Sequence, residues 1–368
     1  MRKYGVFILV LIFGLQQLHC MNSPDTSSAG SLGMRFRNIS FVRNNEYSNP
    51  ITEGYTLIGY FIQPELVYSP SDRLRLSLGI HLLQFSGTNG FHLVKPVFTS
   101  SFNLTGNMVF TMGTLQGSDS HRMFDPHFSK ERLYNAFAED GLELRFLNDH
   151  FFNDVWLSWE NFIFRGDNER EIFTAGESFS YSSEKIGRSI RIRIPVQMMF
   201  KHYGGQISDY PEKVETYFNL AAGAGLSYDI ADRDFGETGI EAVFYYGKSL
   251  TGKPSSGIGR GTGAWYKIRY SYRDSEIDAG LWTSDDFFAP NGNYIFGSVS
   301  DHFHNYVIHR RRLLTCSASI RLVHKSFLEF FLGFEGFWDT DLRRFDNAVS
   351  LHLRFDKLIS LARLKDQR

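Results

Sequence analysis

After residue 33 the chain alternates polar and apolar residues in about sixteen consecutive segments. Residues 73–83 illustrate the pattern, since every second residue is apolar: Leu74, Leu76, Leu78, Ile80 and Leu82. Segments 189–201, 264–272 and 314–322 repeat it. Because successive side chains of a β-strand point to opposite faces, each segment predicts a strand with one apolar and one polar face.

The connections between these segments tend to alternate in length. Counted from the first segment, the odd ones are longer: residues 45–53, 86–90, 116–138, 166–170, 204–213, 249–262, 286–305 and 338–346. The even ones are only a few residues each: 69–72, 105–107, 147–150, 182–187, 230–236, 273–275 and 324–326. A transmembrane β-barrel has short turns at one rim, long loops at the other and an even number of strands. We therefore predict an all-β fold, a single antiparallel transmembrane β-barrel of about 16 strands (range 14–18), with a long third external loop.

Two segments place polar residues on the face that would meet lipid. Glu177 does so in residues 172–181, and Asn38 and Ser40 do so in residues 33–43. A charged side chain that faces lipid at the middle of the membrane costs ~2–4 kcal/mol if basic and less if acidic. We expect these segments to be bulged, shorter or shifted.

The first residues are typical of a secretory signal peptide, because two basic residues precede a short apolar stretch. We assign residues 1–20 to this signal, with cleavage between residues 20 and 30; lipidation of Cys20 is the alternative. Residues 33–355 then form the barrel, and residues 356–368 form a periplasmic C-terminal tail. Export and a transmembrane barrel together predict a location in the bacterial outer membrane.

Composition argues against several other functions. The formal net charge of −1 gives no reason to expect nucleic-acid binding. Once Cys20 leaves with the signal, Cys316 is alone and can form neither an internal disulfide nor a cysteine-based zinc site. The sequence contains no repeating metal-ligand pattern and no cofactor motif in a suitable context, so we expect no metal and no cofactor.

Basic residues outnumber acidic ones on the predicted inner face of the barrel. The predicted pore-lining basic wall consists of Arg35, Arg37, Arg73, Arg75, Arg191, Arg193, Lys267 and Arg269. Such a wall concentrates anions through its summed field, and rings of Arg or Lys are found in anion-preferring pores. The alternative is that these charges pair with acids across strands and simply fill the interior.

The third external connection, residues 116–138, is the longest, and here the chain resembles the porin superfamily. The resemblance implies that this loop folds into the lumen and narrows it, with acids that face Arg35, Arg37, Arg73 and Arg75 on the opposite wall. The predicted constriction residues are Asp119, His121, Arg122, Asp125, Glu131 and Arg132. As a whole, the chain also resembles uncharacterised outer-membrane proteins of the Bacteroidota type.

The same loop carries residue types that a hydrolase or a metal site would use. His121 and His127 lie among serines and carboxylates, and residues 301–304 contain a second pair of histidines. Neighbours in sequence seldom have the geometry of a catalytic triad. We therefore expect polar loops and no enzymatic activity, with a barrel hydrolase as a minor alternative.

These observations predict a channel for passive diffusion of small polar or anionic solutes, with a mild anion preference. It would lie among outer-membrane lipid and lipopolysaccharide and be constricted by residues 116–138. The alternative is a non-conducting barrel that serves as a scaffold or partner in an envelope assembly, its lumen plugged by the same loop. We expect no nucleic-acid partner, and the sequence identifies no protein partner.

Overall fold

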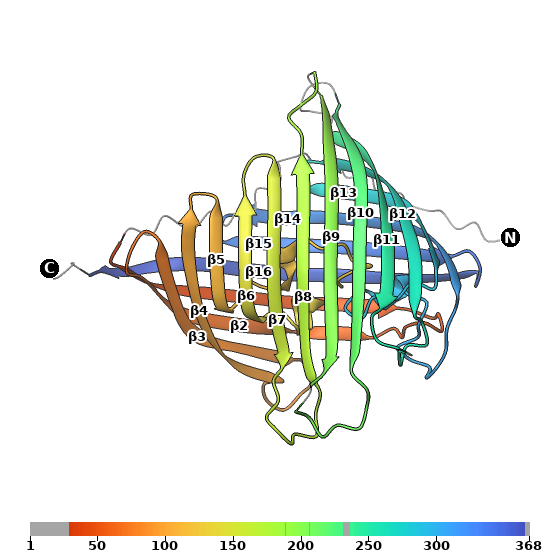
Figure 1. Cartoon of the computed structure of the whole chain (residues 1–368). Helices are drawn as coiled ribbons and strands as arrows, with labels where there is room; N and C mark the ends of the chain where they lie inside the picture. Colours follow the sequence, from red (N-terminus) through yellow and green to blue (C-terminus); the bar gives the residue numbers. More distant parts are fainter. Residues whose placement is uncertain (1–28, 188, 206, 231–235, 253, 365–368) are drawn as a thin grey trace.

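The structure, a computed structural model, describes residues 29–364 except 188, 206, 231–235 and 253. Sixteen strands form one closed barrel, in which consecutive strands pair antiparallel and β16 closes against β1 (Figure 1). This confirms the predicted fold class and strand number. The predicted signal peptide, residues 1–20, lies outside the described residues.

The strands are β1 (Ser31–Glu46), β2 (Thr56–Ser69), β3 (Leu74–Phe85), β4 (Leu93–Thr105), β5 (Met108–Thr114), β6 (Asp140–Leu147), β7 (Phe151–Asn161), β8 (Glu171–Ser182), β9 (Ile190–Gly204), β10 (Glu215–Asp229), β11 (Glu237–Ser249), β12 (Arg260–Tyr272), β13 (Ser275–Asp285), β14 (Arg310–Lys325), β15 (Leu328–Asp339) and β16 (Arg344–Arg363). Three short helical segments lie in loops: η1 (Ser118–His121), α1 (Arg132–Asn135) and η2 (Tyr294–Phe296). No helix in the described residues is long and apolar enough to cross a membrane.

The connections at one rim are longer than most of those at the other. We number the external loops L1 (47–55), L2 (86–92), L3 (115–139), L4 (162–170), L5 (205–214), L6 (250–259), L7 (286–309) and L8 (340–343). The turns at the periplasmic rim are 70–73, 106–107, 148–150, 183–189, 230–236, 273–274 and 326–327. The alternation of loop length therefore holds, with L8 as a short exception and with L3 and L7 as the two longest loops.

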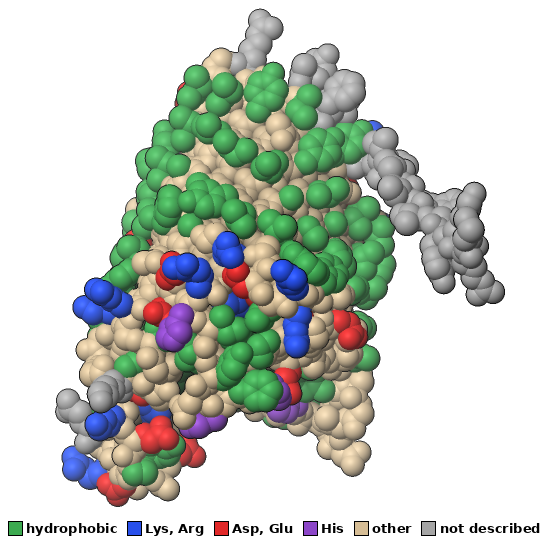
Figure 2. Space-filling model, turned by 90° about the vertical axis from the view of Figure 1, so that its right-hand side faces the viewer, with side chains coloured by type: hydrophobic (Ala, Val, Ile, Leu, Met, Phe, Trp, Pro, Cys, Tyr) green, Lys and Arg blue, Asp and Glu red, His purple; other side chains and the backbone are tan. Residues whose placement is uncertain are grey.

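The outer face of the barrel is apolar. Leu78 of β3 and Ile268 of β12 are each 62% exposed, whereas their inward neighbours Ser77 and Lys267 are buried. Figure 2 shows a broad zone of hydrophobic side chains above a zone that holds most of the charged and histidine side chains on that face. An apolar wall around a polar interior is the arrangement of a barrel that spans a lipid bilayer.

The strands that carry outward polar residues are regular at those positions. Asn38 donates from Nδ2 to the Phe61 carbonyl at 2.7 Å, and Ser40 donates to Oδ1 of Asn38 at 3.3 Å. Glu177 lies opposite Met198 in β8, which pairs with β9 in one continuous register. The expected bulges or shifts at these positions are therefore wrong, because hydrogen bonds within the wall satisfy Asn38 and Ser40, and the register continues across Glu177.

The last strand is longer than the sequence predicts. β16 continues to Arg363, and its residues 357–363 pair with residues 31–36 of β1. The prediction of a tail that begins at residue 356 is wrong to this extent. Pairing with β1 gives these backbone groups the hydrogen-bond partners that a free tail would have to find in water.

The substitution Ile268→Arg tests the orientation of the wall. A guanidinium on the lipid face should lower the free energy of unfolding by about 2–4 kcal/mol. The measurement is denaturant unfolding of the barrel in lipid vesicles, followed by tryptophan fluorescence. Ile268→Leu is the control and should cost less than about 1.5 kcal/mol. An Ile268→Arg variant as stable as the control would contradict the outward assignment.

Candidate functional site

L3 crosses the lumen and is held by opposite walls of the barrel. Arg37 of β1 donates to the carbonyl of Gln116 at 3.3 Å. Gln197 of β9 donates to the carbonyl of Arg122 at 3.1 Å and accepts from the backbone N–H of Phe124 at 2.9 Å. Since β1 and β9 lie half a barrel apart in the strand order, these contacts place L3 across the interior, as the resemblance to porins implied.

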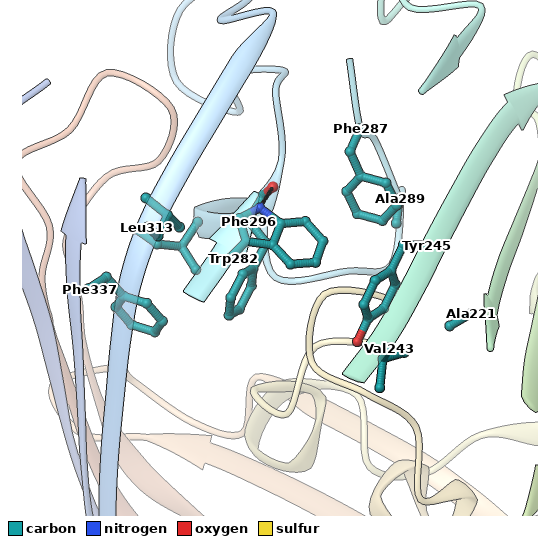
Figure 3. Packing of buried hydrophobic residues seen from close by; sticks show 10 residues of the cluster. Ala221, Val243, Tyr245, Trp282, Phe287, Ala289, Phe296, Leu313 and Phe337 are labelled. Carbon is teal, nitrogen blue, oxygen red and sulfur yellow. Dashed lines mark hydrogen bonds between the residues drawn. The ribbon is translucent and has the colours of Figure 1, made fainter. Parts of the chain in front are cut away.

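Two clusters of inward apolar side chains hold the loops inside. The first, shown in Figure 3, places Trp282 and Phe296 between Leu313 and Phe337 on one side and Tyr245 with Phe287 on the other. The second joins Tyr134 and Phe137 of L3 to wall residues Ile39, Phe41, Phe61 and Leu83. The strand residues of these clusters share the parity of the polar inner face and the others lie in L3 and L7, so the alternation pattern does not single them out. Their burial seats L7 and L3 against the wall.

L3 and L7 also bind each other through Asp125. Asn293 donates to Oδ2 of Asp125 from its side chain at 2.9 Å, and its backbone N–H donates to the Asp125 carbonyl at 2.9 Å. The backbone N–H of Lys130 donates to the other carboxylate oxygen at 2.9 Å. Burial raises the pKa of Asp125 above its usual range, although these donors and the nearby Lys130 oppose the shift.

The predicted basic wall is neutralised within the barrel. Six of its eight residues pair with carboxylates: Arg35–Asp356, Arg37–Glu65, Arg191–Glu237, Arg193–Glu241, Lys267–Glu241 and Arg269–Asp278. Arg75 lies in β3, whereas Arg73 is exposed in the turn before it. This is the arrangement described by the alternative in which the charges pair across strands.

The acids of L3 contact partners other than the predicted ones. Glu131 accepts from Arg43 at 3.1 Å, from Asn45 at 3.0 Å and from the Tyr55 hydroxyl. Asp119 pairs with Arg354, and Arg132 donates to Glu139 at 3.1 Å. The expected contacts with Arg35, Arg37, Arg73 and Arg75 are therefore replaced by contacts with Arg43 and Arg354, because L3 lies closer to the external half of β1 and crosses to β16.

His121 is fully buried between carboxylates. Its Nδ1 lies 2.9 Å from Oδ2 of Asp154, and its Nε2 lies 2.8 Å from Oε2 of Glu139. The ring stacks on Trp156 with the ring centroids 3.9 Å apart. Burial disfavours the charged ring, but the hydrogen bonds to Asp154 and Glu139 outweigh it and raise the pKa of His121 to about 9. A histidine that has no access to solvent is unsuited to act as a general base for a bound substrate.

His127, the second histidine of L3, is also fully buried. Neither ring nitrogen has a hydrogen-bond partner among the described residues, and the ring packs edge-on against Tyr245. Burial lowers the pKa of His127 to about 3, so the ring is neutral. Neither histidine of L3 can therefore meet a substrate from solvent.

A large polar vestibule occupies the periplasmic part of the lumen. Its volume is about 1890 Å³, and it extends from periplasmic turn residues such as Asp149 and Arg273 to Ser118 and Lys130 of L3. Among the described residues, no external loop other than L3 lines it. L3 therefore bounds the vestibule on its external side.

A second pocket opens at the external rim, above the junction of β16, β1 and β2. It has a volume of about 570 Å³ and is lined by Tyr47, Ser48, Asn49, Pro50, Glu53, Gly54, His302, Phe303 and Arg344. Nδ1 of His302 lies 2.7 Å from Oε1 of Glu53, and both side chains remain partly exposed. This places a carboxylate-oriented histidine in an accessible external pocket. The sequence analysis noticed His302 but not Glu53, which lies in a distant loop.

Hydrogen bonds between L1 and L7 fix the position of His302. Ser300 donates to the Pro50 carbonyl at 2.8 Å, and the Asp301 backbone N–H donates to the Ile51 carbonyl at 2.9 Å. The Thr52 hydroxyl donates to Oδ2 of Asp301 at 2.8 Å. These hydrogen bonds join residues 50–52 of L1 to residues 300–301 of L7, next to Glu53 and His302. A reacting pair needs neighbours that hold its geometry in this way.

Comparison with known proteins gives the family. A family model described as Lipid A 3'-O-deacylase-type matches residues 24–364. The chain belongs to this family. The expectation that the protein is not an enzyme is therefore wrong, since the matching family is an enzyme family. No short motif announced this activity, and none of the curated proteins matches the chain.

Solved structures share the fold. The chain resembles a loop L8 deletion mutant of OmpT, an outer-membrane protein of Vibrio cholerae, with a TM-score of 0.50 and 12% identity over 90% of this chain and 100% of that one. It also resembles OprD of Pseudomonas aeruginosa (TM-score 0.50, 8% identity, 95% and 98% covered) and OccK11 of the same organism (0.51, 8%, 91% and 98%). These similarities, together with the apolar outer wall, identify an outer-membrane β-barrel and carry no information on its chemistry.

The substitution Glu131→Ala tests how L3 is held in the lumen. It removes the carboxylate that accepts from Arg43 and Asn45 and leaves Arg43 with Glu335 as its other acidic partner, so the free energy that keeps L3 docked should fall by about 1.5–3 kcal/mol. Trypsin should then cut after Lys130 or Arg132 faster than in the unchanged protein. Asp119→Ala, which removes a partly exposed ion pair worth ~1 kcal/mol or less, is the control. Equal cleavage rates in both variants would argue against Glu131 as an anchor.

Proposed function

We propose that this protein is an outer-membrane hydrolase that cleaves an acyl ester of a lipid A-type glycolipid in the rim pocket. Membership of the Lipid A 3'-O-deacylase-type family supports the reaction class. The observation that carries the location is the His302–Glu53 pair, at 2.7 Å in an open external pocket. His121 and His127 offer no comparable access, because both rings are fully buried.

Glu53 and His302 have the arrangement of an oriented general base. With the Nδ1 hydrogen donated to Glu53, Nε2 of His302 can take a proton from a water molecule that attacks the ester carbonyl. A carbon–oxygen bond to this water forms and the ester carbon–oxygen bond breaks. The proton passes from His302 to the leaving alkoxide, so that a free fatty acid and an alcohol leave the site.

Arg344 lines the same pocket and donates to the carbonyl of Ser48. A guanidinium at this position would stabilise the negative charge that develops on the ester oxygen. Ser48 itself is engaged with Asp346, because its hydroxyl donates to Oδ1 of that carboxylate at 3.4 Å and its backbone N–H donates to the same oxygen at 2.6 Å. We therefore assign the attack to water rather than to a serine nucleophile.

The position of the pocket suits a substrate in the outer leaflet. Outward residues just below it are apolar and exposed, with Phe345 at 50% and Ile58 at 45%. They would contact acyl chains, while the pocket above them meets the headgroup. Three further arginines lie near this rim, at the start of β14 and in L8: Arg310, Arg312 and Arg343. Arg310 pairs with Asp285 and Arg312 with Asp341, and a phosphorylated headgroup would compete with these exposed carboxylates for the guanidinium groups.

A diffusion channel stays a second candidate, favoured by the polar vestibule of about 1890 Å³. L3 and L7 would have to leave a continuous path for solutes to cross the barrel. Their packing across the lumen, with Asp125 and Asn293 joining the two loops, favours a closed state. The two functions are separable because the rim pocket lies outside the vestibule.

The substitution His302→Ala tests the proposed base. Release of fatty acid from a bisphosphorylated, acylated glucosamine disaccharide in mixed micelles should fall by about 10²–10⁴-fold, the usual contribution of a general base. Glu53→Gln should lower the rate in the same direction. His304→Ala, in the same exposed segment but outside the pocket, is the matched control and should keep full activity. Equal activity of the His302→Ala and His304→Ala variants would rule out this site.

Conductance distinguishes a channel from a closed barrel. In planar bilayers the unchanged protein should show little or no conductance, because L3 and L7 lie across the lumen. Removal of residues 117–137 should produce conductance from this low baseline. A large, anion-selective conductance in the unchanged protein would instead support the channel, and it would leave the test of His302 unaffected.

A further inference from the structure

The buried cluster around His121 presents three ligand atoms to one point. Nδ1 of His121, Oδ2 of Asp154 and Oε1 of Glu143 face one another, with Nδ1 at 2.9 Å from Asp154 and 3.8 Å from Glu143. All three atoms lie within 4.8 Å of one another. We propose that these residues bind a divalent metal ion of the zinc type, which fixes L3 to the barrel wall.

The second nitrogen of the ring sets its tautomer. Nε2 of His121 lies 2.8 Å from Oε2 of Glu139, and the other oxygen of that carboxylate accepts from Arg132 at 3.1 Å. Nε2 therefore carries a hydrogen, and the lone pair of Nδ1 can point toward Asp154 and Glu143. A carboxylate that holds the far nitrogen of a histidine is the usual support of a histidine–zinc bond.

The spacing and the donor types fit zinc. Ligands about 2.0–2.1 Å from a tetrahedral zinc lie roughly 3.3 Å from one another, between the two distances from Nδ1. Oδ1 of Asp154 is buried and has no hydrogen-bond partner among the described residues, so this carboxylate keeps unused acceptor capacity beside the three ligand atoms. Calcium prefers six to eight oxygen ligands, far more than this site offers.

The charges of the cluster leave room for a cation. Glu139, Glu143 and Asp154 contribute three carboxylates, whereas Arg132 and Arg145 contribute two guanidinium groups. The proton on His121 supplies a third positive charge, and a divalent metal ion in its place would bring the total to four positive charges against three carboxylates. Arg145 lies 3.0 Å from the carboxylate of Asp154 and 2.5 Å from that of Glu143, so it contacts both carboxylate ligands.

The ligands come from three separate elements. His121 ends η1 in L3, Glu143 lies in β6 and Asp154 lies in β7. A metal ion here would cross-link the loop to two strands of the wall, and each ligand is at least 98% buried. Such closed sites are structural, and the binding free energy of the metal adds to the stability of the fold.

Zinc content tests the site directly. The full chain without an affinity tag, folded in detergent micelles with Zn²⁺ and then passed through gel filtration, should retain about one zinc ion per chain. Its unfolding temperature should rise with zinc and fall after chelation. Folded barrel that retains no zinc and shows no thermal shift would overturn the proposal, and this measurement needs no variant.

Variants assign the ligands. His121→Ala and Glu143→Gln should each abolish retention of zinc, whereas His150→Gln, a change at the periplasmic turn, should leave it intact. Absorption of the Co²⁺-substituted protein should report four-coordinate nitrogen and oxygen ligands, and the bands should vanish with His121→Ala. Zinc retained in folded His121→Ala protein would overturn the assignment. Activity of the rim pocket should be unaffected by Co²⁺ substitution, so the two proposals can fail separately.

Discussion

The closure of the sheet governs the rest of the structure. Inside a bilayer no water is available to satisfy backbone N–H and C=O groups, so a spanning sheet must have no open edge. Pairing of β1 with β16, from Ser31 opposite Arg363 to Glu46 opposite Asn347, removes the last edge. The pairing also explains why the final strand extends beyond residue 355: every residue at the start of β1 needs a partner on this side as well as on β2.

A closed sixteen-stranded wall surrounds an interior that has to be filled or left open to water. Here two loops fill its external part. L3 docks through Tyr134 and Phe137, L7 docks through Phe287 and Phe296, and buried ion pairs such as Arg43–Glu131 connect loop to wall. Arg43 also pairs with Glu335, so removing Glu131 leaves this buried arginine with one of its two carboxylates and weakens the connection between L3 and the wall. With the external part of the lumen filled, the proposed lipid site lies at the rim.

The local sequence was sufficient to predict the strands of the wall, but it was insufficient to predict the candidate site. The alternation of apolar and polar residues, as from Leu74 to Leu82, predicts the strands, and the lengths of the connections predict which rim each connection lies at. Ile39 and Phe41 lie on the same inner face as Arg35 and Arg37. The sequence around them does not indicate that L3 packs against these two apolar side chains. The His302–Glu53 pair joins L7 to L1, so its two halves carry no common motif. A pair built from two distant loops, such as the proposed base and its carboxylate, can be recognised only from the folded barrel.

Hydrogen–deuterium exchange of the folded protein in micelles most directly tests whether the barrel is filled from within. Within residues 118–134, the amides of Ser120, His127, Phe128, Arg132, Leu133 and Tyr134 donate to carbonyls of L3, and the amide of Ser129 donates to the carbonyl of Asn291 in L7 at 2.7 Å. They should exchange slowly, at rates close to those of the strands. Exchange of residues 118–134 as fast as that of the exposed residues 87–91 in L2 would show that L3 is a free external loop, and the filled interior would be wrong.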